Sequence, residues 1–254
     1  ISLNLHSFIG RHIIPKRWQH KKRPIVINNW EGTGFDFTKE KILAIAKNGK
    51  KAGAELFVLD DGWFGERNDD SSSLGDWIDN EAKTGGIARL ADDIRALGME
   101  FGIWIEPEMI SPHSELFRTH PEYAMAIPKK KPFLHRNQMM LDLTNADVRK
   151  YVENSVENVI RLTKSAYIKW DFNRVMSDCF STSVFIGEYF HRYVVALYDI
   201  MQTLTERHPD ILFEGCAAGG ARFDLGVLCY FPQIWTSDNT DAPVRTEIQT
   251  NTSL

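Results

Sequence analysis

Three apolar segments of the chain each end in acidic side chains. Tyr167–Asp171 reads YIKWD, Gln233–Asp238 reads QIWTSD, and Phe57–Trp63 reads FVLDDGW. Aspartates at the carboxyl ends of successive parallel strands are how an α/β barrel places acids around one pocket. Two carboxyl groups flanking one bond are the machinery of glycosidic cleavage. These residue types and their positions predict an enzyme that cleaves sugars.

Asp171 is the first catalytic candidate, as the nucleophile. It lies two residues after Lys169 and two before Asn173, and side chains two apart on a strand share a face. A neighbouring cation and a hydrogen-bond donor favour the ionised carboxylate, which suits a nucleophile. The alternative interpretation is a buried Lys–Asp pair that only stabilises the barrel.

Asp238 is the second candidate, as the general acid/base. An acid that stays protonated near neutral pH needs partial burial or a neighbouring negative charge. Trp235 and Asp171 are expected to supply the two. Asp241 competes for this role but reads more simply as a structural acid.

Further polar and aromatic residues are expected to bind the sugar. Asp60 and Asp61 are adjacent carboxylates that can accept hydrogen bonds from neighbouring hydroxyls of one ring; alternatively they cap the following loop. Trp30 and Trp104 offer apolar faces for the C–H surface of a sugar, unless they belong to the core. Arg136 would donate to sugar hydroxyls, or else be a solvated loop residue.

The segments that must position these side chains alternate between strand and helix. Strands are expected over 24–29, 55–60, 100–105, 167–171, 211–213 and 233–236. Helices are expected over 38–52, 88–97, 188–208, and from 144 or 145 through valines at helical spacing. A loop over 65–86 and an irregular stretch over 111–140 complete the pattern. Parallel strands joined by helical crossovers make this an α/β fold.

A (β/α)8 TIM barrel is favoured over a doubly wound sheet. Acids follow several strands, and Trp30–Gly34 (WEGTG) lacks the third glycine of a phosphate-binding turn. Too few residues follow Asp238 for another strand and helix, which need roughly 30. We therefore expect a barrel truncated after its sixth strand. Residues 1–22 would be a lead-in segment from a missing N-terminal β-domain, and residues 23–254 an incomplete catalytic barrel.

Several other function classes find little support. A net charge of −4 gives no electrostatic reason to bind nucleic acid or an anionic membrane, and no apolar run approaches the ~20 residues of a membrane span. No zinc-protease or serine-hydrolase motif is present, so no metal or cofactor is expected, although Glu106 and Glu108 with the aspartates at 60 and 61 form an alternative cation set. Three cysteines without metal-ligand spacing favour a reducing compartment, hence the cytoplasm.

Five separated motifs resemble those of one enzyme family. They are Leu59–Phe64 (LDDGWF), Gly102–Met109 (GIWIEPEM), Lys169–Arg174 (KWDFNR), Glu214–Gly220 (EGCAAGG) and Trp235–Ala242 (WTSDNTDA). In this order they resemble the bacterial α-galactosidases of glycoside hydrolase family 36, over roughly residues 23–254. Asn239 is a small departure, because many relatives carry a second aspartate there.

The resemblance implies a retaining α-galactosidase that acts on melibiose or raffinose-type oligosaccharides by double displacement. Asp171 would be the nucleophile and Asp238 the acid/base. The matching galactose-binding positions are Asp60, Asp61, Trp104, Arg136, Lys169, Asn173 and Cys216, with Trp30 at the pocket edge. It also implies that the full-length protein is a homo-oligomer, as many relatives are tetramers. A galactosyltransferase with the same intermediate and a catalytically incomplete sugar-binding fragment are the alternatives.

Overall fold

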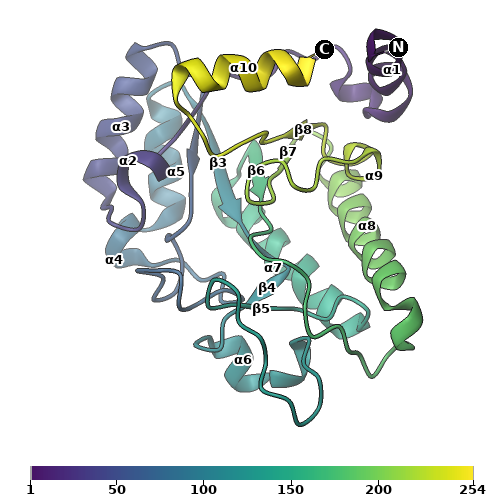
Figure 1. Cartoon of the computed structure of the whole chain (residues 1–254). Coiled ribbons are helices and arrows are strands. Elements are labelled where there is room, and N and C mark those ends of the chain that lie inside the picture. The colour runs from purple at the N-terminus through teal and green to yellow at the C-terminus, as the bar shows by residue number, and fades with distance from the viewer. Residues whose placement is uncertain (1, 254) are drawn as a thin grey trace.

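Six parallel strands form the central sheet of the molecule (Figure 1). The computed structural model describes residues 2–253. The strands are β1 (Val26–Asn28), β2 (Leu56–Leu59), β3 (Glu100–Ile105), β6 (Tyr167–Trp170), β7 (Leu212–Gly215) and β8 (Gln233–Ile234). They pair in that order, and every pairing is parallel. The six predicted strands are confirmed, because each end lies within two residues of its expected position.

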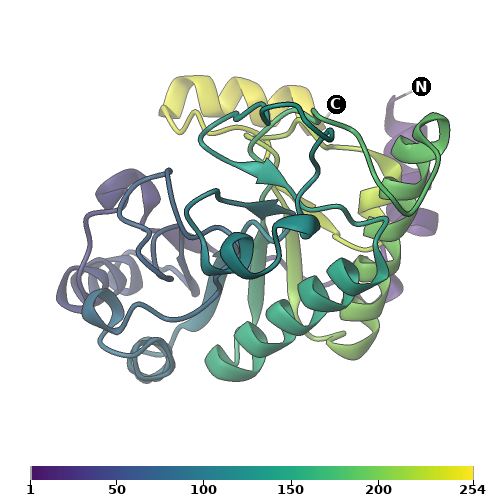
Figure 2. The ribbon, with the colours of Figure 1, turned by 90° about the horizontal axis from the view of Figure 1, so that it is seen from below.

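Four long helices connect the strands and cover the outer face of the sheet (Figures 1 and 2). They are α3 (Lys39–Lys51), α5 (Ile87–Ala96), α7 (Ala146–Thr163) and α8 (Tyr189–Arg207). The side chains of Thr38 and Asn145 accept backbone hydrogen bonds at the starts of α3 and α7, as N-cap residues do. All four predicted helices are therefore confirmed. Within residues 2–253, no helix combines the length and apolar character needed to span a bilayer.

Shorter elements occupy the connections. They are α1 (Ser2–Phe8), η1 (Ile9–Ile13), η2 (Lys16–Trp18), α2 (Trp30–Thr33), α4 (Glu81–Thr84), β4 (Met109–Ile110), α6 (Glu115–Thr119), η3 (Pro121–Tyr123), β5 (Met139–Met140), η4 (Ile186–Glu188), α9 (Leu225–Leu228) and α10 (Ala242–Ser253). β4 and β5 pair antiparallel. The expectation of an irregular stretch over 111–140 is wrong in part, since it holds α6, η3 and β5. A two-residue strand is too short to show an alternating pattern.

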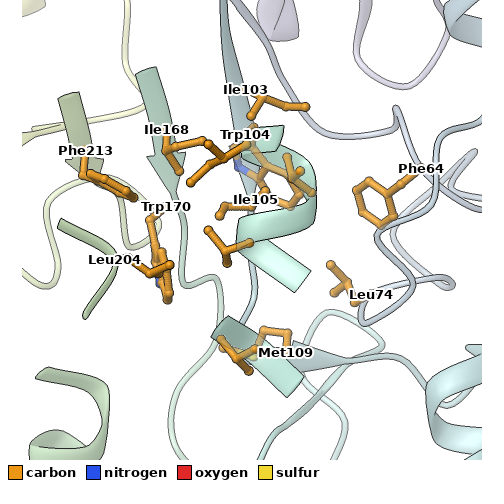
Figure 3. Packing of buried hydrophobic residues seen from close by; sticks show 14 of the residues in the cluster. Phe64, Leu74, Ile103, Trp104, Ile105, Met109, Ile168, Trp170, Leu204 and Phe213 are labelled. Carbon is orange, nitrogen blue, oxygen red and sulfur yellow. The ribbon is translucent and has the colours of Figure 1, made fainter. Parts of the chain in front are cut away.

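Alternate residues of the strands build two separate apolar layers. The outer layer packs under the helices and includes Ile103, Ile105, Ile168, Trp170 and Phe213 (Figure 3). The inner layer lies at the amino ends of the strands and consists of Leu56, Val58, Tyr167 and Leu212. Trp18 of η2 packs into this inner layer and is 7% exposed. The segment before residue 23 therefore covers the amino end of the sheet, while its assignment to a separate β-domain stays a prediction.

β1 and β8 are the two edges of a sheet that curls into part of a barrel. The chain after β8 crosses to the β1 side, where the Thr240 hydroxyl donates to the Glu31 carboxylate of α2. α10 follows this crossing and lies near one end of the molecule (Figure 1). A cavity of about 950 Å³ lies between the two edges and is lined by β1, β8 and α10. The predicted α/β barrel that stops after six strands is confirmed, whereas α10 was not predicted.

Candidate active site

The parallel register aligns polar side chains in two rows at the carboxyl end of the sheet. The first row consists of Trp104, Lys169 and Glu214, because Lys169 pairs with Trp104 of β3 and with Glu214 of β7. Backbone hydrogen bonds continue the same register beyond the strand ends, and side chains two residues apart share a face. The second row consists of Glu106, Asp171 and Cys216. Acidic side chains from successive strands therefore meet at one place, as predicted.

Asp171 is held by a full set of neutral donors. It lies directly after β6 and is 6% exposed. Its Oδ2 accepts from Trp104 Nε1 (3.0 Å) and Asn173 Nδ2 (2.6 Å), and its Oδ1 accepts from the backbone N of Phe172 (2.8 Å). The Cys216 thiol also hydrogen-bonds to Asp171; burial and then the Asp171 charge raise the pKa of Cys216, so the thiol keeps its proton. These donors fix the orientation of the carboxylate.

Lys169 forms its ion pair with Asp60. The distance from Lys169 Nζ to Asp60 Oδ2 is 2.8 Å, and both side chains are buried. Burial opposes the charge on Lys169, but the Asp60 carboxylate outweighs it and raises the pKa of Lys169. Asn28 Nδ2 donates to the same Asp60 oxygen (2.5 Å). The structural Lys–Asp pair considered for Asp171 thus involves Asp60, and no described lysine or arginine forms an ion pair with Asp171.

Asp61 forms a buried bidentate ion pair with Arg67. Arg67 Nε and Nη2 each lie 2.9 Å from an oxygen of Asp61. Burial raises the pKa of Asp61, and the adjacent guanidinium opposes this shift. Arg67 Nη1 also donates to the carbonyl of Ser72 (2.8 Å), so this residue fastens the 65–86 loop to the end of β2. Arg67 was not predicted as part of the site, because it lies inside a polar loop.

Asp238 lies at the rim and is exposed, so its predicted partial burial is wrong for this chain. Trp235 Nε1 donates to Asp238 Oδ1 (2.8 Å). Asp238 lines the 950 Å³ cavity together with Trp30 and Lys169. Its exposure follows from the path of the chain, because the segment after β8 runs along the open side of the sheet. Asp241 Oδ1 accepts from the backbone N of Val244 at the start of α10 (3.5 Å), which fits a structural acid.

The remaining predicted residues divide between the site and its edge. Trp30 starts α2, is half-buried and lines the cavity. Trp104 is 2% exposed, so it serves the site through its indole N–H more than through an open face. Arg136 lies on an exposed loop and forms no hydrogen bond or ion pair with any described residue. The residues that the structure gathers are Asp60, Asp61, Trp104, Lys169, Asp171, Asn173 and Cys216, with Trp30 and Asp238 at the rim.

Glu106 is a buried carboxyl group whose place in the site the sequence did not reveal. It follows β3 directly, and its Oε1 accepts from the backbone N of Asn173 (2.5 Å) and from Gln138 Nε2 (2.8 Å). Burial, and after it the charge of Asp171, raises the pKa of Glu106 to about 8. Its position after a strand was the available signal, but Glu106 was considered only as a cation ligand.

Glu108 is also occupied by protein donors. Its Oε1 accepts from Arg222 Nη1 (2.7 Å) and Trp170 Nε1 (2.9 Å), and its Oε2 from the Tyr193 hydroxyl (2.8 Å). In the part of the chain that the structure describes, no three or more His, Cys, Asp or Glu side chains are arranged to hold a metal ion. Glu106 and Glu108 are thus both held by hydrogen-bond donors of the protein.

Comparison with known proteins agrees with this geometry. The family described as Melibiase matches residues 1–254. The chain is 48% identical to the bifunctional alpha-galactosidase/sucrose kinase AgaSK of Mediterraneibacter gnavus, covering all of this chain and 27% of that protein. It is 46% identical to alpha-galactosidase Mel36A of Lactobacillus acidophilus, covering all of this chain and 35% of that protein. The chain thus spans about a third or less of the length of these curated relatives.

The solved structures agree with the sequence relatives. A doubly substituted variant of the GH36 alpha-galactosidase AgaA from Geobacillus stearothermophilus, in complex with stachyose, superposes with a TM-score of 0.95 at 46% identity. The match covers 99% of this chain and 36% of that one. A second variant of AgaA, in complex with raffinose, gives a TM-score of 0.93 over 97% of this chain and 35% of that one. The whole-length family match and these structures together show that this chain belongs to the melibiase family.

Proposed function

We propose that this chain carries the catalytic site of a retaining α-galactosidase, which removes terminal α-linked galactose from melibiose and raffinose-type oligosaccharides. The observation that carries the proposal is Asp171, a buried carboxylate oriented by Trp104 and Asn173 and free of an ion-pair partner among the described residues. The raffinose and stachyose complexes of AgaA support the substrate class.

The proposed reaction is a double displacement. Asp238 protonates the glycosidic oxygen while Asp171 attacks the anomeric carbon, which gives a covalent galactosyl-aspartate and releases the leaving group. Asp238 then takes a proton from water, which attacks the anomeric carbon and releases galactose with its α configuration retained. The substrate hydroxyls would be held by Asp60, Asp61, Arg136, Lys169, Asn173 and Cys216, with Trp30 and Trp104 beside the ring.

A chain that binds galactose without turnover is the second candidate function. The exposure of Asp238 favours it, because a solvated carboxyl group at the rim is a weak acid catalyst. A galactosyltransferase that uses the same covalent intermediate would instead pass galactose to a sugar. A product analysis at high acceptor concentration separates the transferase from the hydrolase.

The proposal also includes the cellular compartment and the oligomeric state of the whole protein. All three cysteines are free thiols, which supports a reducing compartment and hence the cytoplasm. A homo-oligomeric assembly, tetrameric as in many members of the family, is the state that the resemblance implies for a protein of the relatives' full length.

The test is hydrolysis of p-nitrophenyl α-galactoside by the folded chain, with the β-anomer as the matched control. Release of p-nitrophenol from the α-anomer alone is the expected result. Cleavage of both anomers or of the β-anomer alone would contradict the assignment. Galactose binding in calorimetry without turnover would select the second candidate.

Asp238→Ala should slow the hydrolysis of melibiose more than the hydrolysis of p-nitrophenyl α-galactoside, whose leaving group is activated. Melibiose needs a protonated leaving group, so we expect its turnover to fall by roughly 10²–10⁴-fold. p-Nitrophenol leaves with less help, so the first step on its galactoside should fall less. Azide should restore turnover of the p-nitrophenyl substrate and yield α-galactosyl azide, identified by NMR. Equal losses on both substrates would remove Asp238 as the acid.

A further inference from the structure

We propose that Glu106 is a positioning residue that works in its neutral form. Its carboxyl group holds Asn173 against Asp171 and leaves Asp171 as the only charge of a buried carboxyl pair. This inference rests on the proposed function of Asp171 as the nucleophile, and it concerns how the protein keeps that carboxylate charged and oriented.

The backbone places Glu106 and Asp171 next to each other. Ile105 of β3 is the register partner of Trp170 of β6, and the backbone N of Asp171 donates to the Ile105 carbonyl (2.8 Å). Glu106 and Asp171 are the next residues of the two strands, so their side chains leave the sheet on the same face. Their exposures are 1% and 6%. The two carboxyl groups therefore share one site that excludes most water.

Asn173 links the two carboxyl groups. Its backbone N donates to Glu106 Oε1 (2.5 Å), while its side-chain Nδ2 donates to Asp171 Oδ2 (2.6 Å). Gln138 Nε2 donates to the same Glu106 oxygen (2.8 Å) and fixes it from the other side. The position of the Asn173 amide, and with it one of the two donors to Asp171 Oδ2, thus depends on the acceptor that Glu106 provides.

The surroundings favour one charge and place it on Asp171. Asp171 accepts three hydrogen bonds besides that of the Cys216 thiol, and Lys169 and Arg222 act on it as cations. Glu106 faces the negative groups Asp171 and Asp61, and Arg174 is the cation that acts on it without forming an ion pair. Two adjacent buried carboxylates repel each other, so such a pair keeps one proton at pH values at which an isolated carboxyl group is already ionised.

The protonation state of Glu106 affects how well Asp171 is oriented toward the anomeric carbon. A neutral Glu106 adds no second negative charge beside Asp171, so the repulsion between them does not compete with the orientation imposed by Trp104 and Asn173. Ionisation of Glu106 at alkaline pH would add that charge and displace Asn173 or Asp171. Turnover should therefore fall at alkaline pH for a reason independent of the acid/base residue.

The primary test needs no turnover. The indole N–H of Trp104 donates to Asp171 (3.0 Å), so its NMR resonance, assigned with Trp104→Phe, reports charge changes in the pair. In the wild-type chain we expect one titration step in the mildly alkaline range. Glu106→Gln should remove the step, Asp171→Asn should move it to lower pH, and the exposed control Glu115→Gln should leave it unchanged. A step that persists in Glu106→Gln, or the absence of any step in the wild type, would overturn the proposal.

The kinetic test separates positioning from structure. α-Galactosyl fluoride releases fluoride with little acid help, so its pH profile reports the pair more than Asp238. Glu106→Gln keeps an uncharged acceptor and should retain kcat within about threefold while losing the alkaline fall. Glu106→Ala frees Asn173 and should lower kcat on the order of 10²-fold with little change in KM. Equal activity of both variants and the wild type would refute the positioning role, whereas no turnover by any of them would count against the proposed function alone.

The proton on Glu106 also makes the free energy of unfolding depend on pH. The native chain keeps a proton on Glu106 that the unfolded chain, with an ordinary glutamate pKa near ~4.3, has already released. The free energy of unfolding should therefore fall as the pH rises from about 5 to about 8. Urea unfolding at several pH values should give a shallower fall for Glu106→Gln than for the wild type, and equal slopes would contradict a raised pKa.

Discussion

Replacing Asp171 with alanine should lower the turnover of p-nitrophenyl α-galactoside on the order of 10⁴-fold or more. The carboxylate is the group that forms the covalent bond in the proposed mechanism, and no other described carboxylate is held by Trp104 and Asn173 in the same way. Asp238 is exposed and bound only by Trp235 among the described residues, so it is not positioned to replace Asp171. The measurement is the initial rate under saturating substrate, together with a thermal melt to show that the variant folds.

Rescue by azide shows from which face of the galactose ring Asp171 attacks the anomeric carbon. A small anion that enters the space left by alanine attacks from the side of the missing carboxylate, so it should restore turnover and give β-galactosyl azide. This anomer is opposite to the one expected from Asp238→Ala, because there the galactosyl-aspartate still forms and azide replaces water. The matched control is Asp210→Asn, an exposed aspartate before β7 at the other end of the sheet, which should keep wild-type rates. α-Galactosyl azide from Asp171→Ala would assign the nucleophile to another residue.

The strands and long helices could be predicted because local pattern and burial agree. β2 and β6 are buried along their whole length and end at Asp60 and Asp171; β2 is a continuous apolar segment, and Lys169 is the one polar residue in β6. α7 carries its buried valines at helical spacing after the cap Asn145. In α10, by contrast, large apolar residues are few, and the hydrogen bond from the backbone N of Val244 to Asp241 at its start is long (3.5 Å). This helix depends on where the chain crosses the open side of the sheet, which a local pattern does not encode.

The acids of the site could be located, but their partners could not. Asp60 and Asp61 follow the end of β2, and Asp171 follows the end of β6. The parallel register of the strands then brings these acids together. Arg67 reaches Asp61 only because the 65–86 loop folds back over the end of β2. Loop paths are set by contacts distant in sequence, and the sequence carries no periodic signal for them. The same reason explains why the exposure of Asp238 was not foreseen.

Replacing Arg67 with methionine should destabilise the chain by ~3–5 kcal/mol, the usual cost of leaving a buried charge unpaired. Arg67 and Asp61 are 1% and 4% exposed, and the pair is bidentate. Without the guanidinium, Asp61 keeps its burial and the neighbouring charge of Asp60, so the pKa of Asp61 should rise further. Its native state would then bind a proton that the unfolded state releases. Urea unfolding should therefore show a deficit that is largest at neutral pH and shrinks as the pH falls toward the ordinary aspartate range.

The double variant Asp61→Asn with Arg67→Met separates the stranded charge from lost packing. Removing both charges leaves no unpaired carboxylate, so the double variant should be more stable than Arg67→Met alone and should lose its pH dependence. Arg118→Met is the matched control, because the Arg118–Glu115 pair lies on the surface and its loss should leave the unfolding midpoint nearly unchanged. If the double variant were as unstable as Arg67→Met, packing of the 65–86 loop by the arginine stem would be the dominant contribution. Since Asp61 is also a proposed acceptor for galactose hydroxyls, recovery of stability without recovery of galactose affinity would assign it both roles, one in holding the loop and one in binding the sugar.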